Sequence, residues 1–134
     1  MHEGRVPGLS AIVFRTVFGG PDPDVVGAAT AVKQELRDVD LVYELDILLH
    51  VGGVISSIED PTGLYAPRVS VAQRRMTAQI RVNRADVLDA PDLSGFLRQT
   101  IRVALQQMIE RIAARDRTVD ADAEIRKLAF LVQR

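Results

Sequence analysis

Two carboxylates and a histidine stand at alternating positions of the segment 41–52, where they could do chemistry together. An extended strand turns Glu44, Asp46 and His50 to one face, because all three have even numbers. Carboxylate and imidazole groups can hold a divalent metal or act as general acid and base. Residues 46 and 50, however, lie about 13 Å apart along a strand, too far for one shared ion without help from elsewhere. We therefore interpret this face as solvated, and we predict no catalytic residue, no metal and no cofactor.

Charge is segregated along the chain around this segment. Residues 38–60 carry acidic side chains and no lysine or arginine, whereas residues 68–84 carry arginines and no acid. On neighbouring strands the two segments would form ion pairs, Glu44 or Asp46 with Arg68 or Arg81. As an alternative, Arg74 and Arg75 at a polar tip could grip a phosphate backbone or an acidic patch of a protein.

Composition sets limits on the class of protein. The 134 residues predict a single domain, 1–134, with disorder left open for 1–9 and 133–134. The chain has no cysteine, which excludes disulfides, thiolate metal sites and cysteine nucleophiles. Its formal charge of −1 gives no general nucleic-acid-binding character. We find neither a signal-peptide start nor an apolar run of about 18 residues, and therefore expect a cytoplasmic protein without a membrane partner.

The element that must organise the core is a long helix over residues 92–116. Its apolar residues recur every three or four positions and form one stripe. Arginines and glutamines are expected on the other side, including Arg98, Arg102 and Arg115. We expect the stripe to be buried in one cluster with the apolar side chains of the strands: Tyr43, Leu45, Ile47, Met76, Ile80, Phe96, Ile101, Leu105 and Met108.

The other elements follow from shorter patterns. Residues 11–18 are apolar at nearly every position and predict an interior strand. A helix is expected from Pro23 to Leu36, a strand over 41–52 with a bulge at Gly52-Gly53, and a last helix capped by Asp120. Residues 68–83 predict either a hairpin or one continuous strand, because their polar tip lacks glycine and asparagine.

The expected fold is therefore of the α+β class, in the order β-α-β-β-β-α-α. We predict a mostly antiparallel sheet with its helices packed on one face. The opposite face, which carries Glu44, Asp46 and Arg81, should stay exposed.

The middle of the chain carries a resemblance to a known family. From Leu41 through Val82 it combines an amphipathic strand ending in VGG, an acidic turn and the segments RVSV and MTAQIRV, and a long arginine-rich helix follows. In this pattern it resembles small actinobacterial α+β proteins of the immunity type, which neutralise polymorphic toxins. The resemblance implies a stoichiometric inhibitor that binds a toxin domain and performs no catalysis.

We accordingly predict a protein-binding surface on the outer sheet face and on the loops at 59–66 and 73–75. Its residues are Glu44, Asp46, His50, Glu59, Asp60, Arg74, Arg75 and Arg81. One alternative is an RNA- or ribosome-associated protein that uses the basic segment from Arg68 to Arg84, although stacking aromatics are missing there. Another alternative is a small enzyme with an unrecognised site. The identity of the partner and a homodimer both stay open.

Overall fold

The computed structural model describes residues 11–18, 23–51, 64–82, 86–87 and 89–131. Its elements follow the predicted order: β1 (Ile12–Phe18), α1 (Pro23–Leu36), β2 (Glu44–Val51), β3 (Leu64–Ser70), β4 (Arg75–Val82), α3 (Leu93–Arg115), α4 (Ala121–Arg126) and the 3-10 turn η1 (Ala129–Leu131). The α+β class is confirmed. The expectations for residues 1–9, 133–134 and Gly52-Gly53 lie outside the described residues.

The four strands form one sheet in the order β1-β2-β4-β3. β2 pairs in parallel with both β1 and β4, and only β3 and β4 are antiparallel, so the prediction of a mostly antiparallel sheet is wrong. The reason lies in the connections. α1 returns the chain so that β2 runs in the direction of β1, and the hairpin places β4, rather than β3, beside β2. Residues 68–82 therefore belong to a hairpin and not to one strand.

β1 lies at an edge of the sheet, and the prediction of an interior strand is therefore also wrong. Val13 is 39% exposed, while its neighbours Ile12 and Phe14 are buried under the helices. The apolar side chain of Val13 made both faces of this strand look buried in the sequence. An edge strand can nevertheless keep a single β-branched residue in water at little cost.

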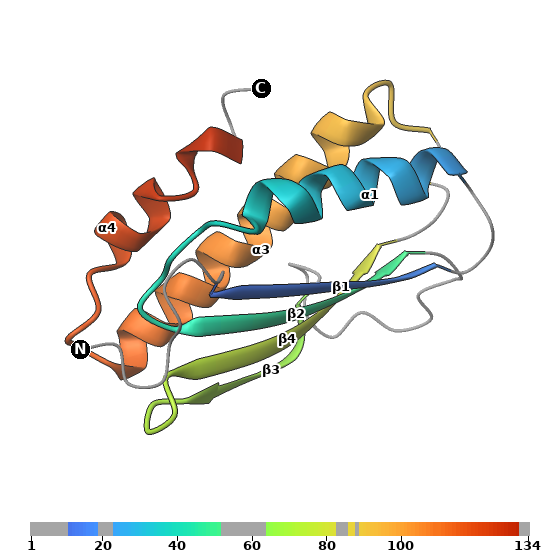
Figure 1. The fold of residues 1–134 in the computed structure, drawn as a ribbon. Helices are drawn as coiled ribbons and strands as arrows, with labels where there is room; N and C mark the ends of the chain where they lie inside the picture. The colour runs from blue at the N-terminus through green and yellow to red at the C-terminus, as the bar shows by residue number, and fades with distance from the viewer. Residues whose placement is uncertain (1–10, 19–22, 52–63, 83–85, 88, 132–134) are drawn as a thin grey trace.

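Both long helices cover the same face of the sheet, as predicted (Figure 1). The odd-numbered residues of β2 point toward them and are buried, while the even-numbered residues are only half-buried. Every residue of the predicted core cluster is buried except Phe96, which is half-buried and packs against its margin. Period-two burial in β2 and β4 therefore defines an inner face and an outer face.

α3 begins and ends where its sequence indicates. The Asp92 carboxylate accepts a hydrogen bond from the N–H of Gly95 at 3.1 Å, and the N–H of Asp116 closes the last turn on the carbonyl of Ile112 at 2.8 Å. Arg98 differs from the prediction, because it is 5% exposed instead of solvated. It forms an ion pair with Glu35 of α1 and donates to the carbonyl of Phe130 at 2.8 Å. Arg98 thus joins α1, α3 and η1.

The C-terminal segment is attached to the start of β2 by a buried carboxylate. Glu124 accepts a hydrogen bond from the N–H of Val42 at 2.6 Å and pairs with Lys127 at 2.7 Å. Lys127 in turn donates to the carbonyl of Asp40 at 3.0 Å. Asp120 caps α4 as expected, through the N–H of Ala123. None of the described helices has the length and apolar character needed to cross a membrane.

Candidate functional site

The outer face of the sheet brings the predicted residues of β2 beside those of β4. In the parallel register Glu44 stands next to Arg75, and His50 stands next to Arg81. Leu48 lies between them on the same face of β2 and is half-buried. Among the described elements, none covers this face (Figure 1). We define the outer face by its side chains: Val13, Arg15, Glu44, Asp46, Leu48, His50, Arg68, Ser70, Arg75, Thr77, Gln79 and Arg81.

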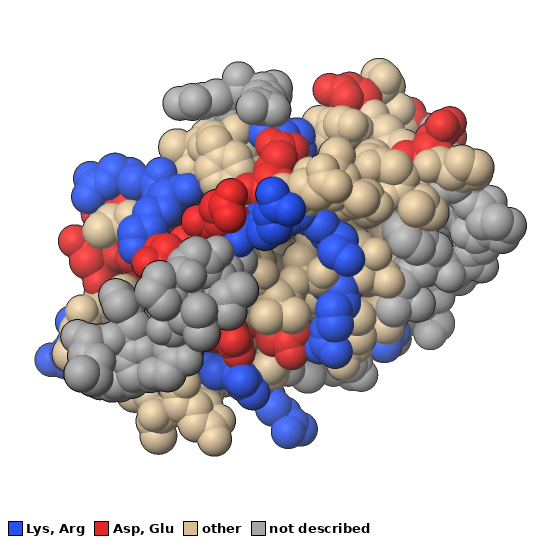
Figure 2. Space-filling view, viewed as in Figure 1, with Lys and Arg blue, Asp and Glu red and all other residues tan. Residues whose placement is uncertain are grey.

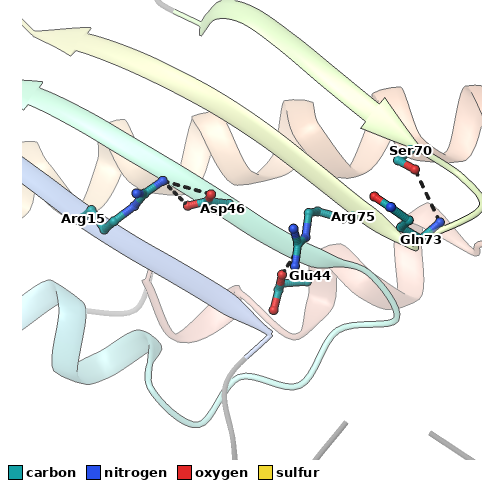
Figure 3. Close-up of polar contacts among 6 residues, drawn as sticks. All are labelled: Arg15, Glu44, Asp46, Ser70, Gln73 and Arg75. Atoms are coloured by element: carbon teal, nitrogen blue, oxygen red, sulfur yellow. Dashed lines mark hydrogen bonds and ion pairs between the residues drawn. The ribbon is translucent and has the colours of Figure 1, made fainter. Parts of the chain in front are cut away.

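Both carboxylates of the outer face are held by arginines from the flanking strands (Figure 3). Arg15 of β1 donates from one nitrogen to both oxygens of Asp46, at 2.8 and 2.9 Å. Arg75 of β4 reaches Glu44 with its Nε at 2.8 Å. The predicted pairing with Arg68 or Arg81 is wrong, because the parallel arrangement places β2 between β1 and β4. Arg15 was missed by sequence reasoning, although it is the single charged residue of its strand.

His50 and the carboxylates do not converge on one point. The Nε2 atom of His50 lies 3.2 Å from Oε1 of Gln79, and the carboxylates face arginines instead. Within the described part of the chain, no group of three histidine, aspartate or glutamate side chains is placed to hold a metal ion. The absence of a metal site in the protein as a whole stays a prediction.

Leu48 gives the outer face an apolar centre. In the register it stands beside Arg15 of β1 and Gln79 of β4, both polar, and Val13 lies further along β1. The stem of an arginine side chain adds apolar surface of its own while its charged end stays in water. The face therefore combines a small apolar centre with fixed charges around it. Leu48 was not among the residues predicted for the binding surface.

The hairpin tip separates the two arginines that were predicted to act together. Ser70 accepts a hydrogen bond from the N–H of Gln73 at 3.4 Å (Figure 3). Arg74 closes the turn with a φ of 50°, in the left-handed region, and its carbonyl accepts from the N–H of Glu44 at 2.9 Å. The charge of Arg74 acts on Asp116 and Tyr43, whereas Arg75 lies on the outer face. The two arginines therefore do not belong to one binding site.

A small polar network lies where the tip meets the end of α3. The Tyr43 hydroxyl donates to Asp116 at 2.7 Å. Burial first, and then this bond and the charge of Asp116, raise the pKa of Tyr43 to about 12. The Thr118 hydroxyl and the Thr118 N–H both donate to Asp116, at 2.6 and 3.0 Å. The hydroxyl bond foremost holds the pKa of Asp116 below its usual range. These shifts are explained by packing and need no ligand.

A hollow elsewhere on the molecule is wide open to water. Asp86, Asp89 and Asp92 border it together with Pro91 and Phe96, next to the start of α3. Asp92 is already used as the helix cap. Such an open hollow excludes little water, so it does not offer the enclosed site that most chemistry needs.

Of the eight residues predicted for the surface, five lie on the outer face: Glu44, Asp46, His50, Arg75 and Arg81. Arg74 lies at the hairpin tip, where its charge acts on Tyr43 and Asp116. Glu59 and Asp60, with most of the predicted loop at 59–66, lie outside the described residues. The structure thus gathers most of the predicted residues, while their role in binding stays a prediction.

Comparisons of the chain with models of protein families, with curated proteins and with solved structures found no match.

Proposed function

We propose that the chain is a non-catalytic protein-binding module, an inhibitor that binds a toxin domain in a stoichiometric complex. The observation that supports this most is the outer face. It has Leu48 at its centre, ion pairs on both sides and no covering element among those described. Protein interfaces have this anatomy, an apolar core within a polar rim. The toxin partner follows from the resemblance to immunity-type proteins alone.

The size of the face fits a specific complex. Four strands of seven or eight residues cover about 20 Å by 25 Å at ordinary strand spacing and rise. Each side of a stable interface buries about 800 Å². The outer face therefore supplies most of such an interface, and the hairpin tip at 71–74 is well placed to extend it. Arginines already fixed by carboxylates lose little freedom on binding, which favours affinity.

An RNA partner fits the outer face less well. Arg15 and Arg75 are each paired with a carboxylate, so a phosphate would have to displace Asp46 or Glu44. Both carboxylates lie on β2, in the middle of the sheet, and would repel a phosphate backbone. We therefore expect no binding of arbitrary RNA below micromolar concentration at physiological salt, and tight binding would overturn the proposal.

A catalytic role has less support than a binding role. The carboxylates of the outer face are held in ion pairs, and the imidazole of His50 contacts an amide side chain. A general acid or base needs a proton path to a bound substrate in a pocket that excludes water. We propose instead that these side chains set the specificity of a protein interface.

The test is binding to the protein encoded beside this chain's gene, measured by titration calorimetry. The wild type should form a one-to-one complex and inhibit its partner. Leu48→Asp places a charge at the centre of the outer face and should weaken binding at least about a hundredfold. Ala31→Asp, at an exposed position of α1, is the matched control and should bind as the wild type does. Equal affinities of both variants would contradict the proposal.

A further inference from the structure

The register of β3 with β4 contains one irregularity, and it sets the face on which Arg68 lies. Tyr65 stands opposite Gln79 and Arg68 stands opposite Thr77, so three steps along β3 match two steps along β4. The extra residue makes a β-bulge, which reverses the alternation of the residues that follow it. Thr77 belongs to the outer face, and Arg68 therefore lies on that face as well.

An uninterrupted ladder would turn the end of β3 the other way round. Arg68 would then stand opposite Met76, which is fully buried on the inner face, and its charge would have to leave water. With the bulge, Val69 takes that place and packs against the core. The bulge thus brings an arginine to the outer face, at its β3 margin.

On the outer face, the charge of Arg68 has no acidic counterpart within the described part of the chain. Arg68 is exposed, and it stands in line with Asp46 across Thr77, with about 10 Å between their backbones. The Asp46 carboxylate, however, accepts from Arg15 at 2.8 and 2.9 Å, and Glu44 is paired as well. Both described acids of this face are therefore already used. Figure 2 shows basic side chains projecting from the lower margin of the molecule, on the side of the sheet that the helices do not cover.

Thr77 adds a hydrogen-bond donor beside this charge. Arg68 and Thr77 are directly opposed on antiparallel strands, a position that brings Cβ atoms to about 5 Å from each other on one face. A guanidinium can donate to one carboxylate with two parallel N–H groups, and a hydroxyl beside it can donate to the same group. The two side chains together are therefore suited to a carboxylate.

The charges of the outer face separate three possible sources of that anion. A second copy of the chain that docked by the same face would offer no unused carboxylate from its described residues, since Glu44 and Asp46 are already paired. A phosphate of RNA would be repelled by both of these acids. An acidic side chain of another protein can instead be placed at the β3 margin, away from β2, and charge complementarity there favours association and specificity.

We propose that Arg68 and Thr77 receive a carboxylate side chain of the partner protein at the β3 margin of the outer face. This assignment rests on the proposed protein-binding role, and it specifies a chemical group of the partner. Leu48 supplies the apolar centre of the interface, whereas Arg68 selects the partner surface that fits against it.

The test is the kinetics of binding to the protein encoded beside this chain's gene, measured by surface plasmon resonance at low and high salt. Arg68→Glu should weaken binding at least about tenfold, mainly through slower association, and salt should reduce the deficit. Thr77→Val keeps the shape of the side chain but loses the hydroxyl, and it should weaken binding about threefold. Arg37→Glu, at an exposed position after α1, is the matched control and should bind as the wild type does.

A double-mutant cycle identifies the carboxylate itself. Each exposed aspartate and glutamate of the partner is replaced by alanine in turn, and one of these changes should cost much less when Arg68→Gln is already present. Arg68→Gln also covers the case in which Arg68→Glu does not fold. The absence of any coupled acid, or wild-type affinity in the Arg68 variants, would overturn the proposal.

The variants distinguish this pair of residues from the outer face as a whole. Loss of binding in Leu48→Asp, with full binding by both Arg68 variants, would remove the pair and keep the interface. Weak binding by the Arg68 variants, with full binding by Leu48→Asp, would support the pair and contradict the apolar centre. A wild type that forms no complex would remove both.

Discussion

On the inner face of the sheet, side chains of β2 and β4 are sealed under two helices, whereas on the outer face the intervening side chains meet no described element. Leu45, Ile47 and Leu49 are 0% exposed, while Leu48 of the same strand is half-buried on the other side. The inner face of β2 and β4 is apolar, and the outer face is tied by ion pairs across three strands. The comparison indicates that stability comes from the inner face. The side chains of the outer face can therefore be chosen for binding rather than for stability.

The largest expected effect is the loss of packing on the inner face. Leu105→Ala leaves a cavity between α3 and the sheet and should lower the free energy of unfolding by about 2–5 kcal/mol. Leu48→Ala on the outer face is the matched substitution and should cost less than about 1 kcal/mol, because that side chain is half in water. Urea denaturation measures both. Equal losses would remove the distinction between the faces.

The buried ion pair between the helices should come next. Arg98→Met removes the ion pair with Glu35 and the hydrogen bond to the Phe130 carbonyl, and we expect a loss of about 1–3 kcal/mol, because Glu35 can be partly rehydrated. Arg102→Met, one turn further on, interrupts only hydrogen bonds to Gln99 and Gln106 and should cost within about 0.5 kcal/mol. Thermal melting of the two variants compares them. Similar melting temperatures would show that Arg98 does not stabilise the packing of α1, α3 and η1.

The network of Tyr43 predicts a dependence on alkaline pH. The folded-state pKa of Tyr43 is about 12, above its ordinary value of 10.0. The stabilisation is therefore complete below pH 10 and is lost as the pH rises through about 12. Tyrosinate absorbance should show one of the two tyrosines ionising late, and Tyr43→Phe should remove that late step. Complete ionisation of both near pH 10 would contradict the burial of this hydroxyl.

The smallest expected effect concerns the ion pairs of the outer face. Their arginines are more than half exposed, and exposed pairs contribute little to stability. Asp46→Asn should lower the free energy of unfolding by less than about 1 kcal/mol, and salt should reduce that difference further. Chemical denaturation with and without added salt tests this. A loss comparable to that of Leu105→Ala would mean that the outer face, too, carries the fold.

Much of this comparison could be predicted from the sequence, because alternation at period two and helical spacing are local properties. They identified the inner residues of β2, the stripe of α3 and the position of Glu44 and Asp46 on the opposite face of the sheet. Pairing is not local, since it depends on which strands become neighbours. Once β2 lies between β1 and β4, Asp46 meets Arg15 rather than Arg68 or Arg81.

The burial of Arg98 could have been predicted from its spacing, but its charge argued for an exposed position. It stands three positions before Ile101 and seven before Leu105, which places it at the margin of the buried stripe. Its charge suggested solvent instead. The outcome depended on Glu35, a residue 63 positions away in the chain, which sequence spacing does not bring into view. Buried charges of this kind are found only when their partner is known.

The most direct test of the outer face as the binding surface is NMR cross-saturation in the complex with the protein encoded beside this chain's gene. Saturation transferred from that partner should attenuate the signals of Leu48, Thr77 and Gln79 and spare the exposed positions of α3, such as Gln99 and Glu110. Attenuation confined to α1 and α3, with Leu48 unaffected, would contradict the account.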